Sequence, residues 1–193
     1  MIYMDIALST AINKLRNQIW FTRKSRIRAS ERILKNHIHS NSILIWYSFL
    51  TFTLSIFLIK KPNYLGDNAD VVMTIATGFV FTLSLFVPQL DMKNRYEKLK
   101  DNYIQLQGLT FDLDICKTEY QLNIINDKYL KLLMSSENHK NSDLQYFIAF
   151  ESDAECNRKL KGIEWGEIVL RVIFRWLFFT TAYFLPLLII FFW

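Results

Sequence analysis

The fold is decided by residues 42–59, SILIWYSFLTFTLSIFLI, an uncharged stretch that follows a strongly basic segment. A second uncharged stretch covers residues 71–90, and a third covers residues 176–193. An α-helix needs about 20 apolar residues to cross the roughly 30 Å hydrocarbon core of a bilayer. The three stretches reach or approach this length, so they predict an all-α integral membrane protein.

The third stretch is the least regular of the three, because Pro186 lies near its middle. Proline is tolerated in a transmembrane helix when neighbouring groups satisfy the backbone that it frees. The aromatic residues Phe191, Phe192 and Trp193 suit an anchor at the membrane interface. We therefore expect a transmembrane helix within residues 167–193, with a re-entrant or interfacial segment as the alternative.

The charges lie between the apolar stretches, although 21% of the 193 residues are charged and 51% are hydrophobic. The net charge of +5 is concentrated before the first stretch, which points to anionic lipid as a partner. Direct nucleic-acid binding is the weaker interpretation, because no motif of interleaved aromatic and basic residues accompanies these charges. Short segments rich in Lys and Arg stay in the cytoplasm. This rule predicts an inner-membrane protein with its N-terminus and residues 91–175 in the cytoplasm, and with its C-terminus outside. The basic residues before the first stretch are Lys14, Arg16, Arg23, Lys24, Arg26, Arg28, Arg32 and Lys35.

Residues 1–35 are predicted to form a helix that is amphipathic in its first half and basic in its second. Such a helix can lie along the inner leaflet, and packing on the cytoplasmic domain is an equal alternative. On the first interpretation, the side chains that contact lipid headgroups are Arg23, Lys24, Arg26, Arg28 and Arg32.

Residues 36–90 are predicted to form a transmembrane hairpin with spans at about 42–59 and 71–90. Small and hydroxyl-bearing residues recur on one face of each span, and this spacing lets helices approach closely. They either pack the two spans together or line an opening between several hairpins. The residues are Ser48, Thr51 and Ser55 in the first span and Thr74, Gly78 and Thr82 in the second.

Residues 91–166 are predicted to form a cytoplasmic helical domain. Its first helix, about 91–113, is expected to continue from the second span with a bend at Pro88. A heptad-like apolar stripe on this helix indicates a coiled-coil surface for self-association. Packing within the chain against the next helix, Glu119 to Met134, is the alternative. The stripe residues are Tyr96, Leu99, Tyr103 and Leu106.

A polar turn follows at residues 135–143, and a third helical segment is expected from residue 144 to about 161. Glu137, Asn138, His139 and Asp143 are our candidates for a surface that receives a cue or a partner. The alternative is a solvated turn with a helix cap at Asp143. Gly162 and Gly166 precede the third span and are a candidate hinge.

The sequence offers no carrier of catalysis, metal binding or cofactor binding. Cys116 and Cys156 match no zinc spacing, and a reducing compartment argues against a disulfide between them. His37 and His39 are two residues apart, so on a helix they point in different directions. We therefore expect no enzyme, no metal and no cofactor.

Four segments in order resemble the SLATT family, the "SMODS and SLOG-associating two-transmembrane effector" domains. The first is RIRASERIL at residues 26–34, and the second is Trp-Tyr-Ser at 46–48 in the first span. The third is NRYEKLKDNY at 94–103, with Leu106 and Leu109 after it, and the fourth is SSENH at 135–139, with Asp143 after it. The resemblance covers about residues 20–150, and the third hydrophobic stretch is a departure from the two-span pattern.

The resemblance implies a membrane effector of a bacterial antiphage or conflict system. It implies a homo-oligomer that perforates or depolarises the inner membrane in abortive infection, when a partner or a nucleotide-derived signal triggers it. The implied partner is a separate sensor, nucleotide cyclase or reverse transcriptase encoded nearby. The first alternative is a membrane-anchored scaffold that recruits such a partner without forming a pore. A dedicated channel or transporter component is the second, and the absence of a charge at the centre of either hairpin span disfavours it.

Overall fold

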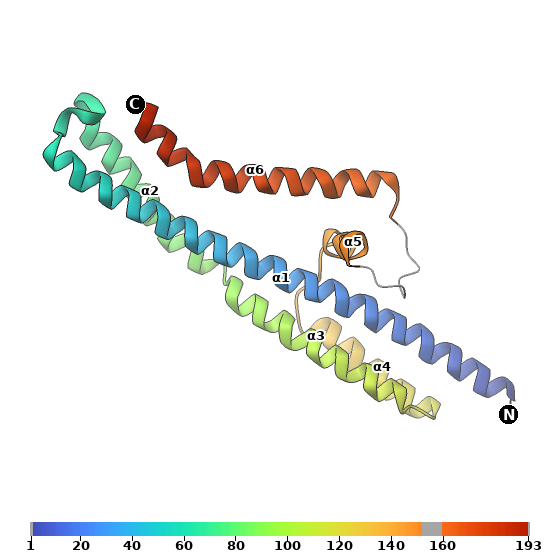
Figure 1. Ribbon diagram of the computed structural model, residues 1–193. Coiled ribbons are helices and arrows are strands. Elements are labelled where there is room, and N and C mark those ends of the chain that lie inside the picture. The colour runs from blue at the N-terminus through green and yellow to red at the C-terminus, as the bar shows by residue number, and fades with distance from the viewer. Residues whose placement is uncertain (1, 152–159, 193) are drawn as a thin grey trace. The chain divides into compact units, whose positions relative to one another are not determined.

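The computed structural model of the protein describes residues 2–151 and 160–192, and these ranges contain helices and no strand. The chain divides into two compact units. The polar unit comprises Met1–Leu34 and Lys93–Ile168, and the membrane unit comprises Lys35–Met92 and Val169–Trp193. The elements are α1 Ile2–Lys60, the 3-10 helix η1 Pro62–Asn68, α2 Ala69–Gln89, α3 Met92–Asp114, α4 Glu119–Met134, α5 Asn141–Phe150 and α6 Gly162–Phe192 (Figure 1).

Helix α1 is one continuous helix of 59 residues that contributes to both units. The basic helix predicted for residues 1–35 and the span predicted at about 42–59 both lie on this one helix. Continuity has a simple cause in the sequence, because Pro62 is the first proline and Gly66 the first glycine of the chain. Without either residue, nothing in residues 2–60 breaks the backbone hydrogen-bond ladder.

The connection between α1 and α2 is the short helix η1, which begins at Pro62. Gly66 has a φ of +70°, a left-handed conformation that glycine adopts without steric cost. The residue before it, Leu65, is buried, and the Phe57 ring meets the Tyr64 ring edge-on with centroids 5.0 Å apart. These features close the transmembrane hairpin.

The expected continuous helix through Pro88 is wrong. Helix α2 ends at Gln89 and α3 begins at Met92, so a break separates them. Asp91 at the break has a φ of +46°. Aspartate is one of the few residues that visit the left-handed region, because its short polar side chain bonds locally. The helical backbone is therefore interrupted at Asp91 and does not run on from Pro88 into α3.

The polar unit has a hydrophobic core made by three helices. Helix α1 contributes Leu15 and Ile19, and the other core residues are Leu106, Leu109 and Leu113 of α3 and Leu122, Ile125 and Tyr129 of α4. Helix α5 adds Phe147, whose ring meets Trp20 of α1 edge-on at 5.4 Å. The first half of α1 therefore packs on the helical domain, which is the second of the two alternatives considered for residues 1–35.

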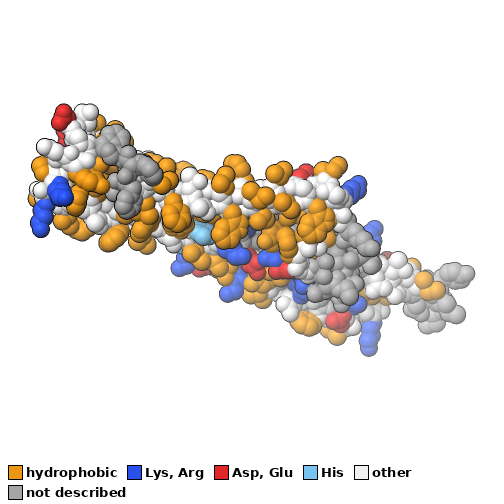
Figure 2. Space-filling model, turned by 45° about the horizontal axis from the view of Figure 1, so that its top comes forward, with side chains coloured by type: hydrophobic (Ala, Val, Ile, Leu, Met, Phe, Trp, Pro, Cys, Tyr) orange, Lys and Arg blue, Asp and Glu red, His pale blue; other side chains and the backbone are white. Residues whose placement is uncertain are grey.

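The membrane unit contains the parts of α1, α2 and α6 that are long and apolar enough to cross a membrane. Their most hydrophobic windows are almost wholly unburied, as expected of helices that face lipid. Figure 2 shows many hydrophobic side chains at the surface. The exposed hydrophobic residues of α6 include Phe174, Trp176 and Leu177. The structure thus agrees with an all-α membrane protein that has a third span.

Candidate functional site: an arginine lock, a proline clamp and a polar groove

The polar unit contains a fully buried arginine, Arg26 of α1. Its Nη1 donates hydrogen bonds to Oδ1 of Asn102 and, at 3.0 Å, to the carbonyl oxygen of Leu132. Its Nη2 donates to the carbonyl oxygen of Leu133 at 3.2 Å. No carboxylate of the described residues pairs with it, so the charge is balanced by neutral acceptors. Burial lowers the pKa of this guanidinium below its ordinary value.

The carbonyl groups that hold Arg26 lie in the last turn of α4. The last four carbonyls of a helix lack partners within the helix and carry the negative end of its dipole. Asn102 strengthens this arrangement, because its Nδ2 donates to the same Leu132 oxygen at 2.8 Å and to Ser135 Oγ at 3.0 Å. We call Arg26, Asn102 and the end of α4 the arginine lock, because they tie α1, α3 and α4 together.

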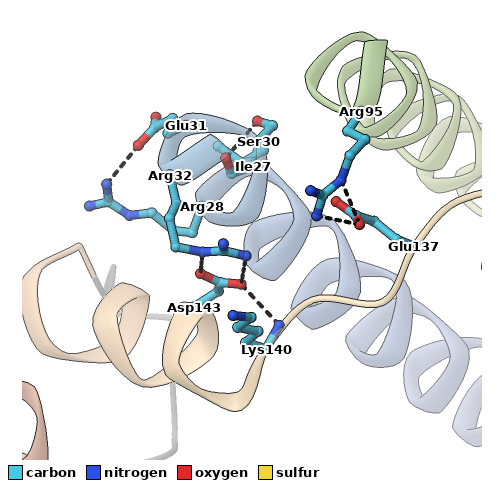
Figure 3. A network of polar contacts seen from close by, with 9 residues as sticks. All are labelled: Ile27, Arg28, Ser30, Glu31, Arg32, Arg95, Glu137, Lys140 and Asp143. Carbon is cyan, nitrogen blue, oxygen red and sulfur yellow. Dashed lines mark hydrogen bonds and ion pairs between the residues drawn. The ribbon is translucent and has the colours of Figure 1, made fainter. Parts of the chain in front are cut away.

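Other arginines of α1 and α3 are paired within the polar unit (Figure 3). Arg32 holds the buried carboxylate of Asp143 with two bonds, 2.7 Å from Nε to Oδ1 and 3.1 Å from Nη2 to Oδ2. Arg28 pairs with Glu31 at 2.7 Å and also with Glu151. Such bidentate, partly buried pairs fix geometry more firmly than exposed pairs do.

This pairing changes the role of the residues predicted to meet lipid headgroups, Arg23, Lys24, Arg26, Arg28 and Arg32. Arg26 is inaccessible, and Arg28 and Arg32 are engaged by carboxylates. The ammonium of Lys24 lies 5.6 Å from the Trp20 ring centroid and 5.3 Å from that of Phe147. Arg23 is half-buried, and its Nε is buried without a partner among the described residues. Most of these basic side chains therefore contact other residues of the polar unit.

The candidate cue residues do not form one surface. Asp143 is 4% exposed, and its Oδ2 also accepts a hydrogen bond from the Lys140 backbone N–H at 2.9 Å. It is thus a cap of α5, as the alternative interpretation proposed. Glu137 pairs with Arg95 of α3 at 2.8 Å, whereas Asn138 is exposed. His139 is half-buried and lines a groove described below.

The predicted self-association stripe on α3 lies mostly on the inner face of the helix. Leu99 and Leu106 are fully buried, whereas Tyr96 and Tyr103 are half-buried. Leu99 and Leu106 are therefore not available to a second copy in this conformation. The opposite face of α3 carries exposed Ile104 and Phe111. The apolar period alone does not say which of the two faces meets the chain's own helices.

The hydroxyl groups of the spans are satisfied within their own helices. Ser48, Thr51 and Ser55 each donate to the carbonyl four residues earlier, at 2.8, 2.8 and 3.0 Å. Thr74 and Thr82 of α2 do the same at 2.7 and 2.9 Å. Gly78, on the same face as these threonines, has no atom within 4 Å of an added Cβ. This small-residue stripe is thus uncovered and compatible with lipid.

Helix α1 is joined to α6 at the proline of the third span. Pro186 has no N–H, so the carbonyl of Ala182, four residues earlier, lacks its helical donor. The hydroxyl of Tyr47 donates to this carbonyl at 3.0 Å, and Nε1 of Trp46 donates to the carbonyl of Tyr183 at 3.0 Å. We call this arrangement the proline clamp, and it explains how Pro186 is accommodated within a continuous helix.

The two histidines before the first span have structural contacts of different kinds. The His39 ring stacks on Phe179 of α6 with centroids 4.1 Å apart. Nδ2 of Asn41 lies 3.2 Å from Nε2 of His37. No group of three His, Cys, Asp or Glu residues suited to a metal occurs in the described parts of the chain. Cys116 is a free thiol, and Cys156 lies outside the described residues.

A groove of about 650 Å³ opens on the polar unit between α1, α4 and the segment that follows α4. A hydrogen bond of 2.8 Å between Thr22 Oγ1 and the Tyr129 hydroxyl crosses it. The groove adjoins the arginine lock, since Leu133 belongs to both. Its polar lining is formed by Lys14, Asn17, Gln18, Thr22, Ser25, Asn126, Tyr129 and His139.

His139 lines this groove and interacts electrostatically with Arg26 and Asp143. Desolvation lowers the pKa of its imidazole, the positive charge of Arg26 lowers it further, and the carboxylate of Asp143 opposes both effects. Desolvation and the charge of Arg26 thus both favour the neutral form of the imidazole. Its Nδ1 is buried and has no hydrogen-bond partner among the described residues.

Sequence reasoning missed the centres of the lock and the clamp. Asn102 interrupts the apolar stripe of α3 in the sequence, and a polar residue at such a position signals a buried specific contact. The clamp could have been inferred from the rule that a proline frees the carbonyl four residues before it. Which residue supplies the donor depends on tertiary packing, which the sequence does not display.

Comparison with known families gave one result. The family model of SLATT_5, the "SMODS and SLOG-associating 2TM effector domain family 5", matches residues 8–193. No curated protein and no solved structure matched the chain. The match extends well beyond the expected residues 20–150 and includes α6, so the third hydrophobic helix lies within the family region. The chain belongs to the SMODS and SLOG-associating 2TM effector domain family 5.

Proposed function

We propose that this protein is the membrane-permeabilising effector of a bacterial antiphage system. In this proposal several copies assemble in the inner membrane, and a cytoplasmic signal causes them to perforate or depolarise it. Membership in a family of membrane effectors supports the effector role. The polar unit lies on the cytoplasmic side in this proposal, as the Lys and Arg bias predicts.

The observation that carries the assembly step is the uncovered stripe of Thr74, Gly78 and Thr82 on α2. Small residues at intervals of four allow helices to approach closely in lipid. Within one copy nothing approaches Gly78, although the hydroxyls beside it are already satisfied by their own helix. A second copy can pack on this stripe without leaving polar groups unpaired. An opening lined by these hydroxyls would be weakly selective, since they carry no charge.

The polar unit would control this assembly through α1, which contributes to both units. The signal, from a sensor, a nucleotide cyclase or a reverse transcriptase, would act on the polar unit. A scaffold that recruits such a partner without permeabilising the membrane is the second candidate. The polar unit carries both paired and unpaired polar groups, and such a surface can recognise a partner, which favours the scaffold.

Membrane potential measured in bacteria expressing the chain separates these two functions. The chain is induced alone and together with its neighbouring genes, and a potential-sensitive dye is recorded with a membrane-impermeant DNA stain. We expect depolarisation when the trigger is present, and loss of it in Gly78→Leu, which blocks close approach on α2. Ile75→Leu, an exposed apolar position of α2, is the matched control. Full polarisation in every condition, with the protein present in the membrane, would favour the scaffold.

A further inference from the structure

We propose that the groove on the polar unit binds a small organic anion that has an apolar portion. The inference rests on the proposed function only for the consequence of binding, since such a ligand would be the signal. Binding itself is tested without reference to membrane permeability.

The first argument is the unused hydrogen-bonding capacity of the groove. Asn17 and Gln18 are exposed and Asn126 is half-buried, and their side chains make no hydrogen bond with any described residue. The Nδ1 of His139 is buried and is also without a partner among these residues. Elsewhere in the unit, polar groups such as Asn102 are fully engaged. Three amides and an imidazole offer both donors and acceptors to one ligand. Only the Nδ1 of His139 is both buried and without a partner in this lining, and such an atom indicates a bound group that satisfies it.

The second argument is the charge of the groove. Lys14 lies in its lining and forms no ion pair within the described ranges, whereas Arg16, two residues later, pairs with Asp114 at 2.7 Å. No Asp or Glu occurs among the described residues that line the groove. Arg26 acts electrostatically on His139 of the lining, and the carboxylate of Asp143 opposes this effect. A negatively charged ligand is therefore favoured over a neutral or cationic one.

The third argument is the size and the apolar part of the lining. The remaining lining includes Phe21, Leu130, Leu133 and Leu144, and Leu130 is 47% exposed. A volume of about 650 Å³ lies within the range of small-molecule sites, roughly 300–1,000 Å³. An inorganic ion would leave most of this surface empty. The ligand class that fits is an organic phosphate or carboxylate with a flat or apolar portion.

The position of the groove gives binding a route to the rest of the unit. Leu133, whose carbonyl holds Arg26, and His139 both line it. A ligand that contacts these residues would change the contacts at the end of α4, where α1, α3 and α4 are tied together. Binding would therefore change the rate of hydrogen–deuterium exchange in the last turn of α4.

The test uses phenyl phosphate as the probe and the full chain in dodecyl maltoside micelles, with binding followed by isothermal titration calorimetry. Inorganic phosphate is titrated in parallel. The variant Lys14→Gln removes the cation of the groove. Lys117→Gln removes one charge from an exposed position outside it and is the matched control. Circular dichroism confirms that each variant keeps its helices.

We expect phenyl phosphate to bind, Lys14→Gln to weaken binding about tenfold, and Lys117→Gln to leave it unchanged, as loss of one charge-assisted hydrogen bond predicts. No binding at millimolar probe, or equal weakening by both variants, would overturn the inference. Inorganic phosphate binding as tightly as phenyl phosphate would overturn it for the apolar portion. If binding holds while cells never depolarise, the proposed function fails and the site remains.

Discussion

The substitution Arg26→Ala should destabilise the end of α4, because Arg26 is fully buried and holds the carbonyls there. The change removes donors from Oδ1 of Asn102 and from the carbonyls of Leu132 and Leu133. Leu132 keeps bonds from Asn102 Nδ2 and Ser135 Oγ, so the acceptors that lose their side-chain donor are the Leu133 oxygen and Oδ1 of Asn102. An unsatisfied buried acceptor costs about 1–3 kcal/mol, and the space left by the buried arginine stem adds a cavity term.

Together these terms give a destabilisation of about 2–4 kcal/mol at the arginine lock. Because 1.4 kcal/mol is a factor of ten, hydrogen–deuterium exchange at the last turn of α4 should accelerate by about 30-fold or more. The matched control is Arg16→Ala, since Arg16 forms an exposed pair with Asp114 and such pairs contribute about 0–1 kcal/mol. Equal exchange rates in the two variants would refute the lock.

Three further substitutions test other contacts. Tyr47→Phe should destabilise the membrane unit by about 0.6–2 kcal/mol in SDS-induced unfolding. This effect should be smaller in a Pro186→Ala background, because the carbonyl of Ala182 then regains its helical donor. An unchanged effect would contradict the clamp. Asp143→Asn should cost about 2–3 kcal/mol in the unfolding free energy, because it removes the charge that Arg32 holds and weakens the α5 cap; a change under 0.5 kcal/mol would show that the pair is dispensable. The pKa of His139 in the folded state lies below its unfolded value near 6.5, so the unfolded state binds more protons in acid and stability should fall as the pH drops through about 6.5. Between pH 7.5 and 5.5, the midpoint of thermal unfolding should fall less in His139→Gln than in the unchanged protein. Equal falls would exclude this histidine as the cause.

The helices were largely predictable because their signals are local. The bounds of α4, Glu119 to Met134, follow from the apolar period and from Thr118, whose side chain accepts from the Gln121 N–H as an N-cap. The three apolar stretches gave the spans, since bilayer thickness fixes the length of a crossing helix. The end of the second span was predicted to within one residue, but the expected continuity of α2 with α3 was wrong, because Asp91 adopts a left-handed conformation between them.

The roles of individual residues were harder to predict, because charge and period do not identify a partner. Arg26 and Arg32 lie in a basic segment before the first span, as lipid-binding residues do. Arg26 is nevertheless held by helix carbonyls and Arg32 by Asp143. Helix α3 carries apolar residues on opposite faces, so a heptad-like pattern could not distinguish intrachain packing at Leu106 from a surface at Phe111. These choices depend on contacts between residues about 100 positions apart.

The most direct test of the central claim is membrane potential in single bacteria during phage infection, in cells with and without this gene. We predict that cells carrying the gene depolarise before lysis, and that Gly78→Leu abolishes both depolarisation and protection. Protection of the culture while individual cells stay fully polarised until lysis would contradict a membrane-permeabilising effector.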